Sequence, residues 1–389
     1  MKTDAPPPLA TNGPRAKRAN RDYRLDFFRG LALVFIFIDH IPDNIVANFT
    51  LRSFALCDAA EVFIFISGYT AALAYGPIFE REGVAMAFAR IYRRVWQLYV
   101  AHLCLFMIFN AEVAYTLKYL YNPLFADELQ VGDYLDNPGE AFIRVLLLQF
   151  QPTLLNILPL YIILLLVLPL QILALRRHIL WGLAPSAALW LAANLLGWNL
   201  PGYPEGRFWY FNPLAWQFLF AIAVALSMMR GRMEWPRWLP AAALIYAIAA
   251  GGVSMSHTLH EFMSWIPRFP YLADSWTEKT MLPPLRLASV MALAVLVSEW
   301  VPRVGRRFTG GAGWWLVLCG QNSLEVFCLS IVLAVLANFL LSLAGYGLIV
   351  QIAVNLGGLL VMIGFGLFLA WFKAGGSLPP PPRPTEADA

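Results

Sequence analysis

The chain has 389 residues, of which 59% are hydrophobic and only 13% are charged, and its mean hydropathy is +0.61. Soluble domains carry about 25% charged residues, so the composition excludes a soluble globular protein and indicates an integral membrane protein. The formal net charge of +4 follows from the placement of Lys and Arg around apolar segments. We therefore expect a lipid bilayer, and no nucleic acid, as a partner.

Long apolar stretches predict an all-α polytopic membrane bundle of about ten helices, because a spanning helix needs about 20 apolar residues. The predicted spans are residues 26–46, 59–76, 95–117, 154–175, 179–197, 212–229, 238–255, 282–300, 313–342 and 348–372. Residues 139–151 are too short to cross a bilayer and predict an interfacial or re-entrant helix.

The basic residues predict the orientation of this bundle. With ten spans and a cytoplasmic N-terminus, 20 of the 28 Lys and Arg residues lie in cytoplasmic segments and six lie outside. The positive-inside rule therefore favours cytoplasmic placement of both termini. We expect a disordered basic tail over residues 1–24, one membrane domain over residues 25–373 and a disordered Pro-rich tail over residues 374–389.

The first predicted span carries ionisable residues that a simple membrane anchor does not need. Arg29 and His40 are eleven positions apart, which places them on nearly the same helix face and about 16 Å apart. Intramembrane charge usually marks a functional site. The alternative is that Arg29 only snorkels to the inner surface, with Asp39 and His40 marking the outer end of the helix.

His40 is the candidate catalytic base, because an imidazole titrates near neutrality and can accept a hydroxyl proton or carry an acyl group. Pro42 disfavours continued helix at residue 41, so we expect His40 near the outer helix end. Asp39 is also a catalytic candidate, although its side chain points about 100° away from that of His40 around the helix, which makes it a poor partner for the imidazole. The carboxylates that could hold the imidazole are those of Asp43, Asp58 and Glu61.

Glu61 is the third catalytic candidate, and its alternative role is a buried structural ion pair with Arg29 or Arg286. A group of arginines opens the third predicted span on the cytoplasmic side: Arg90, Arg93 and Arg94. With Arg29 they could bind phosphates of a nucleotide co-substrate through bidentate hydrogen bonds. A purely topological role would also explain them. His102, further along the same span, is expected to be a satisfied core residue.

The predicted outer loops are rich in aromatic residues, notably over residues 198–216 and 257–276. An interfacial aromatic belt explains part of this enrichment, and stacking on a ring-shaped polar ligand could explain the remainder. The candidate substrate-binding residues are Asp43, Asp58, Arg286, Trp209 and Trp265. The four cysteines show no paired spacing, so we expect neither a disulfide framework nor a metal site.

Several motifs resemble one known family. Asp26-Phe-Phe-Arg-Gly-Leu31, with ten residues separating Arg29 from His40, resembles the arginine–histidine signature of the acyltransferase-three superfamily. A closer resemblance to the OpgC family comes from four segments, which are residues 38–44, 60–69, 90–94 and 320–327.

The resemblance implies a bacterial inner-membrane, multi-pass acyltransferase that moves a succinyl group from succinyl-CoA to a periplasmic glucan. It implies acyl-CoA (succinyl-CoA or acetyl-CoA) as a cytoplasmic co-substrate, with no permanently bound cofactor, and a glucan or other glycan as the outer partner. Two alternatives stay open. One is O-acetylation of another extracytoplasmic polysaccharide or lipid headgroup, and the other is a transporter or glycan-export partner without enzymatic activity.

Overall fold

The computed structural model describes residues 21–120, 129–231, 235–267, 274–303, 308 and 310–381. The predicted tails up to residue 20 and from residue 382 lie outside this part of the chain. All regular elements in the described part are helical, as predicted. In chain order they are α2 (Tyr23–Asp39), η1 (Ile45–Phe49), η2 (Leu51–Ser53), α3 (Ala59–Arg81), α4 (Val84–Leu120), α6 (Gly132–Asp136), α7 (Pro138–Leu146), α8 (Ile157–Arg177), α9 (Ile179–Leu196), α10 (Pro213–Met228), α11 (Leu239–Phe262), α12 (Asp274–Thr277), α13 (Pro284–Trp300), α15 (Gly311–Gln321), α16 (Ser323–Ala344) and α17 (Leu348–Lys373).

Each of the ten predicted spans coincides with helix in the structure, but one of them is divided. The span predicted at residues 313–342 is interrupted at Asn322, which separates α15 from α16. The Asn322 side chain donates a hydrogen bond to the Leu318 carbonyl, 2.9 Å away. Asn side chains compete with the helical backbone for such bonds, which favours a break here. The short interfacial or re-entrant helix predicted at residues 139–151 corresponds to α7, which ends five residues earlier, at Leu146.

Seven helices of the described chain are long and apolar enough to cross a membrane. These are α3, α4, α8, α9, α11, α16 and α17. α2, α10 and α13 have 17, 16 and 17 residues, slightly fewer than the usual span. The protein is thus a polytopic helical membrane protein, while ten spans and cytoplasmic termini stay predictions.

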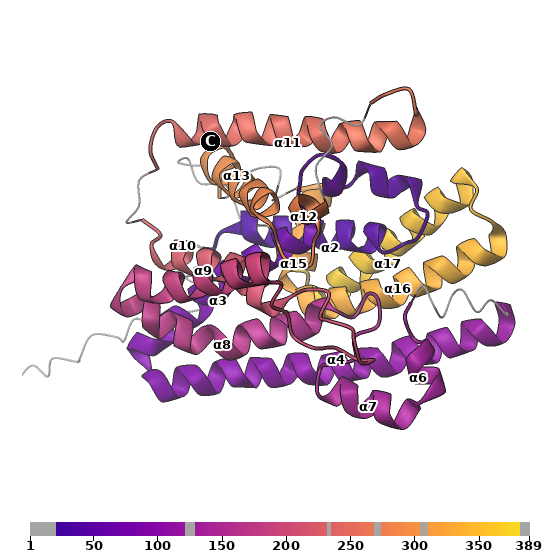
Figure 1. Ribbon diagram of the computed structural model, residues 1–389, viewed down its shortest axis with the longest axis horizontal. Coiled ribbons are helices and arrows are strands. Elements are labelled where there is room, and N and C mark those ends of the chain that lie inside the picture. Colours follow the sequence, from indigo (N-terminus) through magenta and orange to yellow (C-terminus); the bar gives the residue numbers. More distant parts are fainter. Residues whose placement is uncertain are drawn as a thin grey trace, which may run out of the picture.

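Helix α2 occupies the middle of the bundle and packs against α3, α15 and α16 (Figure 1). It begins at Tyr23, so the first helix includes two residues that were predicted as tail. The crossing of α2 and α15 is very close. A Cβ on Gly30 would lie 2.0 Å from the Leu316 carbonyl oxygen, and a Cβ on Gly320 would lie 1.8 Å from the Asp26 carbonyl oxygen. Small residues permit such approaches between membrane helices.

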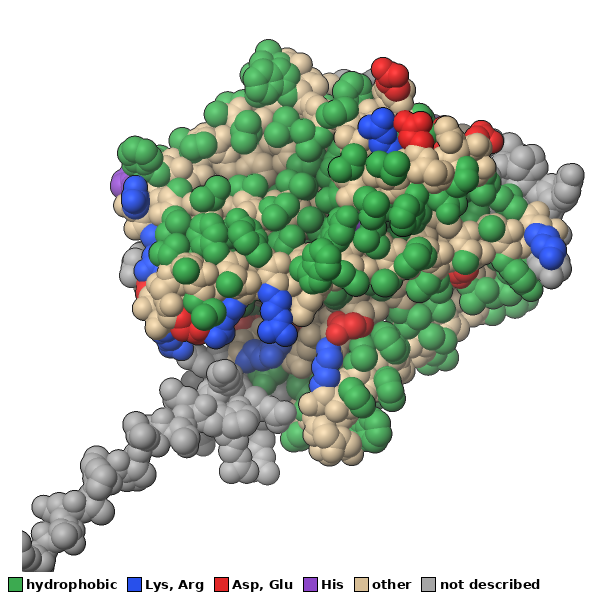
Figure 2. Space-filling view, turned by 90° about the horizontal axis from the view of Figure 1, so that it is seen from below, with side chains coloured by type: hydrophobic (Ala, Val, Ile, Leu, Met, Phe, Trp, Pro, Cys, Tyr) green, Lys and Arg blue, Asp and Glu red, His purple; other side chains and the backbone are tan. Residues whose placement is uncertain are grey.

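The largest core cluster joins α2 to the helices around it, with Phe37, Trp216 and Phe327 among its fully buried side chains. Figure 2 shows one face of the molecule, on which hydrophobic side chains cover the middle and charged side chains gather mainly toward the edges. Such a band is expected where lipid surrounds a protein. Near the C-terminus, Pro379 accepts a hydrogen bond from the Trp314 indole at 3.2 Å, so the tail is in contact with the bundle there.

Three arginines that are predicted to lie on the cytoplasmic side, and that come from distant segments of the chain, form ion pairs with one carboxylate. Arg24, Arg230 and Arg303 surround the buried carboxylate of Asp22 at 2.9, 3.9 and 4.0 Å. Arg24 precedes the first predicted span, Arg230 follows the span at residues 212–229, and Arg303 follows the span at residues 282–300. All three ends are cytoplasmic in the predicted topology, so their contact with one carboxylate agrees with that topology.

Candidate functional site

The C-terminal end of α2 places His40 at the edge of a cavity. The helix ends at Asp39, and the His40 backbone N–H closes the last turn on the Ile36 carbonyl at 3.1 Å. Pro42 follows two residues later, and proline disfavours helix at the residue before it. The predicted position of His40 at a helix end is therefore confirmed.

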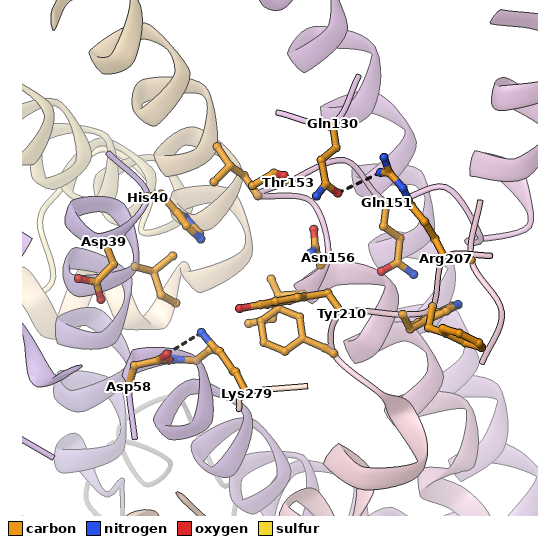
Figure 3. A pocket seen from close by; sticks show the side chains of 18 of the residues that line it. Asp39, His40, Asp58, Gln130, Gln151, Thr153, Asn156, Arg207, Tyr210 and Lys279 are labelled. Atoms are coloured by element: carbon orange, nitrogen blue, oxygen red, sulfur yellow. Dashed lines mark hydrogen bonds and ion pairs between the residues drawn. The ribbon is translucent and has the colours of Figure 1, made fainter. Parts of the chain in front are cut away.

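We call the space beside this residue the His40 cavity, which has a volume of about 450 Å³ (Figure 3). Most of its walls come from the end of α2, the start of α3, the segment between α7 and α8, the loop before α10 and the loop before α13, and η2, α16 and the segment before α6 contribute one residue each. The lining residues are Ile36, Asp39, His40, Arg52, Asp58, Ala59, Ala60, Gln130, Gln149, Gln151, Thr153, Leu154, Asn156, Ile157, Gly202, Tyr203, Arg207, Phe208, Trp209, Tyr210, Phe211, Lys279 and Phe327.

Asp39 and His40 point to different sides, as Figure 3 shows. Asp39 accepts a hydrogen bond from the Thr50 hydroxyl at 2.7 Å and pairs with Arg52 at 3.7 Å. The Nδ1 atom of His40 is buried and has no hydrogen-bond partner in the described part of the chain. None of the predicted carboxylates hydrogen bonds to this nitrogen. Asp43 is exposed and does not line the cavity. The carboxylates of Asp58 and Glu61 are paired with Lys279 and Arg286 instead.

Asp58 and Glu61 belong to a buried network of two acidic and two basic groups. Arg286 Nε donates to Glu61 at 2.5 Å, and its Nη2 reaches Asp58 at 3.2 Å. Lys279 pairs with Asp58 at 2.6 Å. The structural alternative for Glu61, an ion pair with Arg286 and not with Arg29, is thus confirmed. Opposite charges balance one another here, as buried charges require.

The local sequence explains why the two carboxylates lie together. Asp58 is the N-cap of α3 and accepts from the Ala60 N–H at 2.8 Å, while Glu61 accepts from the Asp58 N–H at 3.0 Å. This reciprocal arrangement is a capping box. It fixes Asp58 at the cavity wall and leaves Glu61 behind it, outside the set of lining residues.

Lys279 is a cavity residue that the sequence did not single out. Burial lowers the pKa of its ammonium, but Asp58 and Glu61 raise it by more, so the net pKa is raised. Lys279 therefore stays protonated at neutral pH, 5.2 Å from the ring centre of Phe211. A lone Lys in an aromatic outer loop, shortly before two prolines, was the available signal.

The wall opposite His40 is built of neutral polar side chains that sequence reasoning also missed. Figure 3 labels Gln130, Gln151, Thr153 and Asn156 of this group, and Gln149 also lines the cavity. The side-chain oxygens of Gln151 and Asn156 are buried without a partner in the described part of the chain. Buried polar atoms are normally hydrogen-bonded, so these two acceptors are suited to hydroxyl donors of a ligand. The polar run from residue 149 to 156 between apolar helices was the available signal.

The two predicted tryptophans are placed very differently. Trp209 is buried and lines the His40 cavity, together with Tyr203 and Tyr210. Trp265 is 78% exposed and does not line this cavity. Arg286 also stays behind the wall, since its guanidinium is directed at Asp58 and Glu61.

A second space, the Arg29 cavity, lies nearer the N-terminal end of α2 and has a volume of about 220 Å³. Of the four arginines predicted to bind phosphates together, Arg29 and Arg94 line this cavity. Arg29 donates to the Thr70 hydroxyl, and its Nε is buried without a partner in the described part of the chain. Arg90 and Arg93 are exposed and do not line this cavity, and Arg90 is paired with Glu82 at 2.5 Å.

The two cavities adjoin. Ile157, the first residue of α8, and Phe327 of α16 line both of them. His102 lines neither, and neither ring nitrogen of this buried residue has a hydrogen-bond partner in the described chain. The prediction that His102 is a satisfied core residue is therefore only half right.

Comparison with known proteins agrees with the motifs. The family model described as "OpgC protein" matches residues 21–374, which is nearly the whole chain. No curated protein and no solved structure gives a significant match. The match includes every helix described above and both cavities. It implies an acyltransferase-like membrane function in glucan modification, because this chain belongs to the OpgC family.

Proposed function

We propose that this protein transfers a succinyl group from cytoplasmic succinyl-CoA to a hydroxyl of a periplasmic glucan, across a bacterial inner membrane. The observation that carries the proposal is the adjacency of the two cavities. One contains the unpaired Nδ1 of His40 and the other the unpaired Nε of Arg29. These residues are separated by about 16 Å of helix, so a donor at one end and an acceptor at the other could meet within the protein.

The donor side fits an anion. Arg29 and Arg94 face one cavity, and guanidinium groups bind phosphate oxygens through bidentate hydrogen bonds. A CoA phosphate held there would direct the thin pantetheine arm between Ile157 and Phe327 toward His40. Arg90 and Arg93 would contribute only to the surrounding positive potential.

The acceptor side fits a sugar. The His40 cavity offers unpaired amide oxygens for hydroxyl donors and aromatic side chains for sugar faces. The charged residues of the lining are three basic and two acidic ones (Arg52, Arg207 and Lys279 against Asp39 and Asp58), so the cavity has a formal net charge of +1. This charge would favour the free carboxylate of a succinyl group over a neutral acetyl group.

The transfer step needs a base and a leaving group. In the direct route, His40 takes the proton of the acceptor hydroxyl, the oxygen forms a bond to the thioester carbonyl carbon, and the carbon–sulfur bond breaks. The imidazolium then gives its proton to the CoA thiolate. In the relay route, an unprotonated imidazole nitrogen bonds to the thioester carbonyl carbon as the carbon–sulfur bond breaks and CoA leaves as thiolate. The glucan hydroxyl then bonds to the same carbon, the carbon–nitrogen bond breaks, and the hydroxyl proton passes to the CoA thiolate.

The carboxylates have supporting roles in this scheme. Asp39, Asp58 and Glu61 are held by hydroxyl or basic partners, so they would position the cavity walls and not exchange protons with substrate. Arg286 would position Glu61 and Asp58 in the same way.

The test is purified full-length protein in liposomes, given radiolabelled succinyl-CoA and a purified glucan. We expect label on the glucan and stoichiometric CoA release, both lost in His40→Gln. Acetyl-CoA tested in parallel decides between succinylation and acetylation. Absence of CoA release with either donor and with several glycans would contradict an enzymatic role and favour the transporter alternative.

A further inference from the structure

A third space lies between α13 and the central helices, and it shares only Ala59 with the lining of the His40 cavity and no lining residue with the Arg29 cavity. We call it the Arg230 groove, and its volume is about 800 Å³. Figure 1 shows α11 along one edge of the molecule, with α13 between it and the bundle. Helices α2, α3 and α10 form the opposite wall. Nothing in the proposed transfer reaction uses this groove.

The wall that α2 contributes is an apolar stripe. Leu25, Phe28, Leu31, Ala32 and Phe35 recur at helical spacing and all line the groove. The ten steps of helix from Leu25 to Phe35 correspond to a rise of about 15 Å. One leaflet of a bilayer has a hydrocarbon thickness of about 15 Å, half of the 30 Å core. The groove therefore has the length and the polarity of a site for acyl chains of one leaflet.

The groove carries its charges at one end only, the end of the bundle that is predicted to be cytoplasmic. The charged residues of its lining are three arginines and two acids: Arg24, Arg230, Arg303, Asp22 and Glu299. Their formal net charge is +1. This charge is complementary to the single negative charge of a phosphodiester.

The three arginines at this end differ in how many of their hydrogen-bond donors already have an acceptor. Arg24 donates to both oxygens of Asp22 at 3.0 and 2.9 Å and to the Val301 carbonyl at 2.7 Å. Arg230 and Arg303 approach Asp22 only to 3.9 and 4.0 Å, which is longer than a hydrogen bond. Their guanidinium groups thus keep donors available for an anion. Trp235 and Trp300 lie at the same end, where interfacial tryptophans meet lipid headgroups.

We propose that the Arg230 groove binds an anionic glycerophospholipid, with its phosphodiester on Arg230 and Arg303 and an acyl chain along the α2 stripe. The lipid fills the space between α13 and the bundle and contacts both. Because α13 carries Arg286 to Asp58 and Glu61 at its other end, the lipid stabilises the docking of the helix that supports the His40 cavity.

The experiment uses the purified full-length protein in a neutral detergent. Phosphatidylglycerol should raise the melting temperature by about 2–4 °C, because a ligand that binds only the folded state stabilises it. Phosphatidylcholine of the same chain length, which has no net charge, should raise it much less. Native mass spectrometry should show one retained phosphatidylglycerol per protein.

Variants separate a specific site from a general charge effect. The Arg230→Gln/Arg303→Gln double variant should lose the preference for phosphatidylglycerol, while the matched control Arg81→Gln/Arg177→Gln should keep it, since both control residues are exposed and outside the groove. Ala294→Trp should fill the groove and abolish lipid retention with the arginines intact. Full lipid preference in the double variant would overturn the proposal. An equal stabilisation by glycerol phosphate would also overturn it, because a simple anion site would then suffice.

Discussion

Ile157 and Phe327 each line both the His40 cavity and the Arg29 cavity, so these two side chains form the boundary between them. Phe327 is 1% exposed and stacks on Phe63, with ring centres 6.3 Å apart. A passage for a slender acyl donor would have to pass between an aliphatic side chain at the start of α8 and this aromatic ring.

The boundary can be tested by narrowing it. Ile157→Phe should reduce acyl transfer by about tenfold or more, because a larger side chain in a packed contact costs about 1–3 kcal/mol. The KM for acyl-CoA should change less than kcat, since Arg29 and Arg94 are both kept. Ile157→Val is the matched control and should transfer normally. Normal transfer in a stably folded Ile157→Phe protein would place the donor path elsewhere.

The donor site can be tested with neighbouring arginines. Arg94→Ala should raise the KM for acyl-CoA by about tenfold or more, because a hydrogen bond to a charged group contributes about 1.5–3 kcal/mol. Arg93→Ala is the matched control, since Arg93 is exposed and outside the Arg29 cavity. Arg29→Lys should be only partly active, because an ammonium cannot reproduce the bidentate fork. Steady-state kinetics with varied acyl-CoA concentration measure all three variants. Equal KM values in the Arg93 and Arg94 variants would contradict a donor-binding role for Arg94, and both arginines would then serve only to orient the protein in the membrane.

The role of His40 can be tested by comparing two substitutions. His40→Gln keeps hydrogen bonding but cannot accept a proton at neutral pH, so it should be as inactive as His40→Ala. The loss should reach at least about 10²–10⁴-fold, the usual contribution of a general base. Thermal unfolding should show both variants near the parent in stability, because Nδ1 has no partner in the described chain to lose. An active His40→Gln protein would exclude both routes.

The close crossing of α2 and α15 gives a prediction about stability. Gly30→Ala and Gly320→Ala each introduce a Cβ within 2.0 Å of a backbone oxygen, and overpacking of this kind costs about 1–3 kcal/mol. The midpoint of thermal unfolding should fall in both. Gly364→Ala in α17 meets nothing within 4 Å, and alanine is a better helix former than glycine, so this control should be neutral or stabilising.

The orientation in the membrane can be tested by thiol labelling. In a background without the four native cysteines, Asp136→Cys and Glu205→Cys should react with an impermeant reagent from the periplasm. Arg81→Cys and Arg177→Cys should react only after the membrane is opened. All four positions are exposed. The opposite labelling pattern would place His40 toward the cytoplasm and end the two-sided mechanism.

The sequence by itself determined the class of the fold and most helix positions, because apolar runs of about 20 residues and the basic residues between them are local features. It also determined that Arg29 and His40 share a helix face, since the helical repeat fixes this relation within one segment. The break at Asn322 was not predicted, although the polar residues Gln321, Asn322, Ser323 and Glu325 interrupt the apolar run there. Polar residues also occur inside unbroken membrane helices, so the side-chain bond of Asn322 to the Leu318 carbonyl had to be seen to locate the interruption.

Only the tertiary structure decided which distant residues meet. Glu61 could have paired with Arg29 or Arg286, and the packing of α13 beside the start of α3 selects Arg286. Of three neighbouring arginines on α4, the rotation of the helix about its axis brings Arg94 to the Arg29 cavity and leaves Arg90 and Arg93 exposed. Lys279 and Asn156 reach His40 from loops more than a hundred residues away in the chain. Such contacts depend on how rigid helices pack, which no local pattern in a sequence contains.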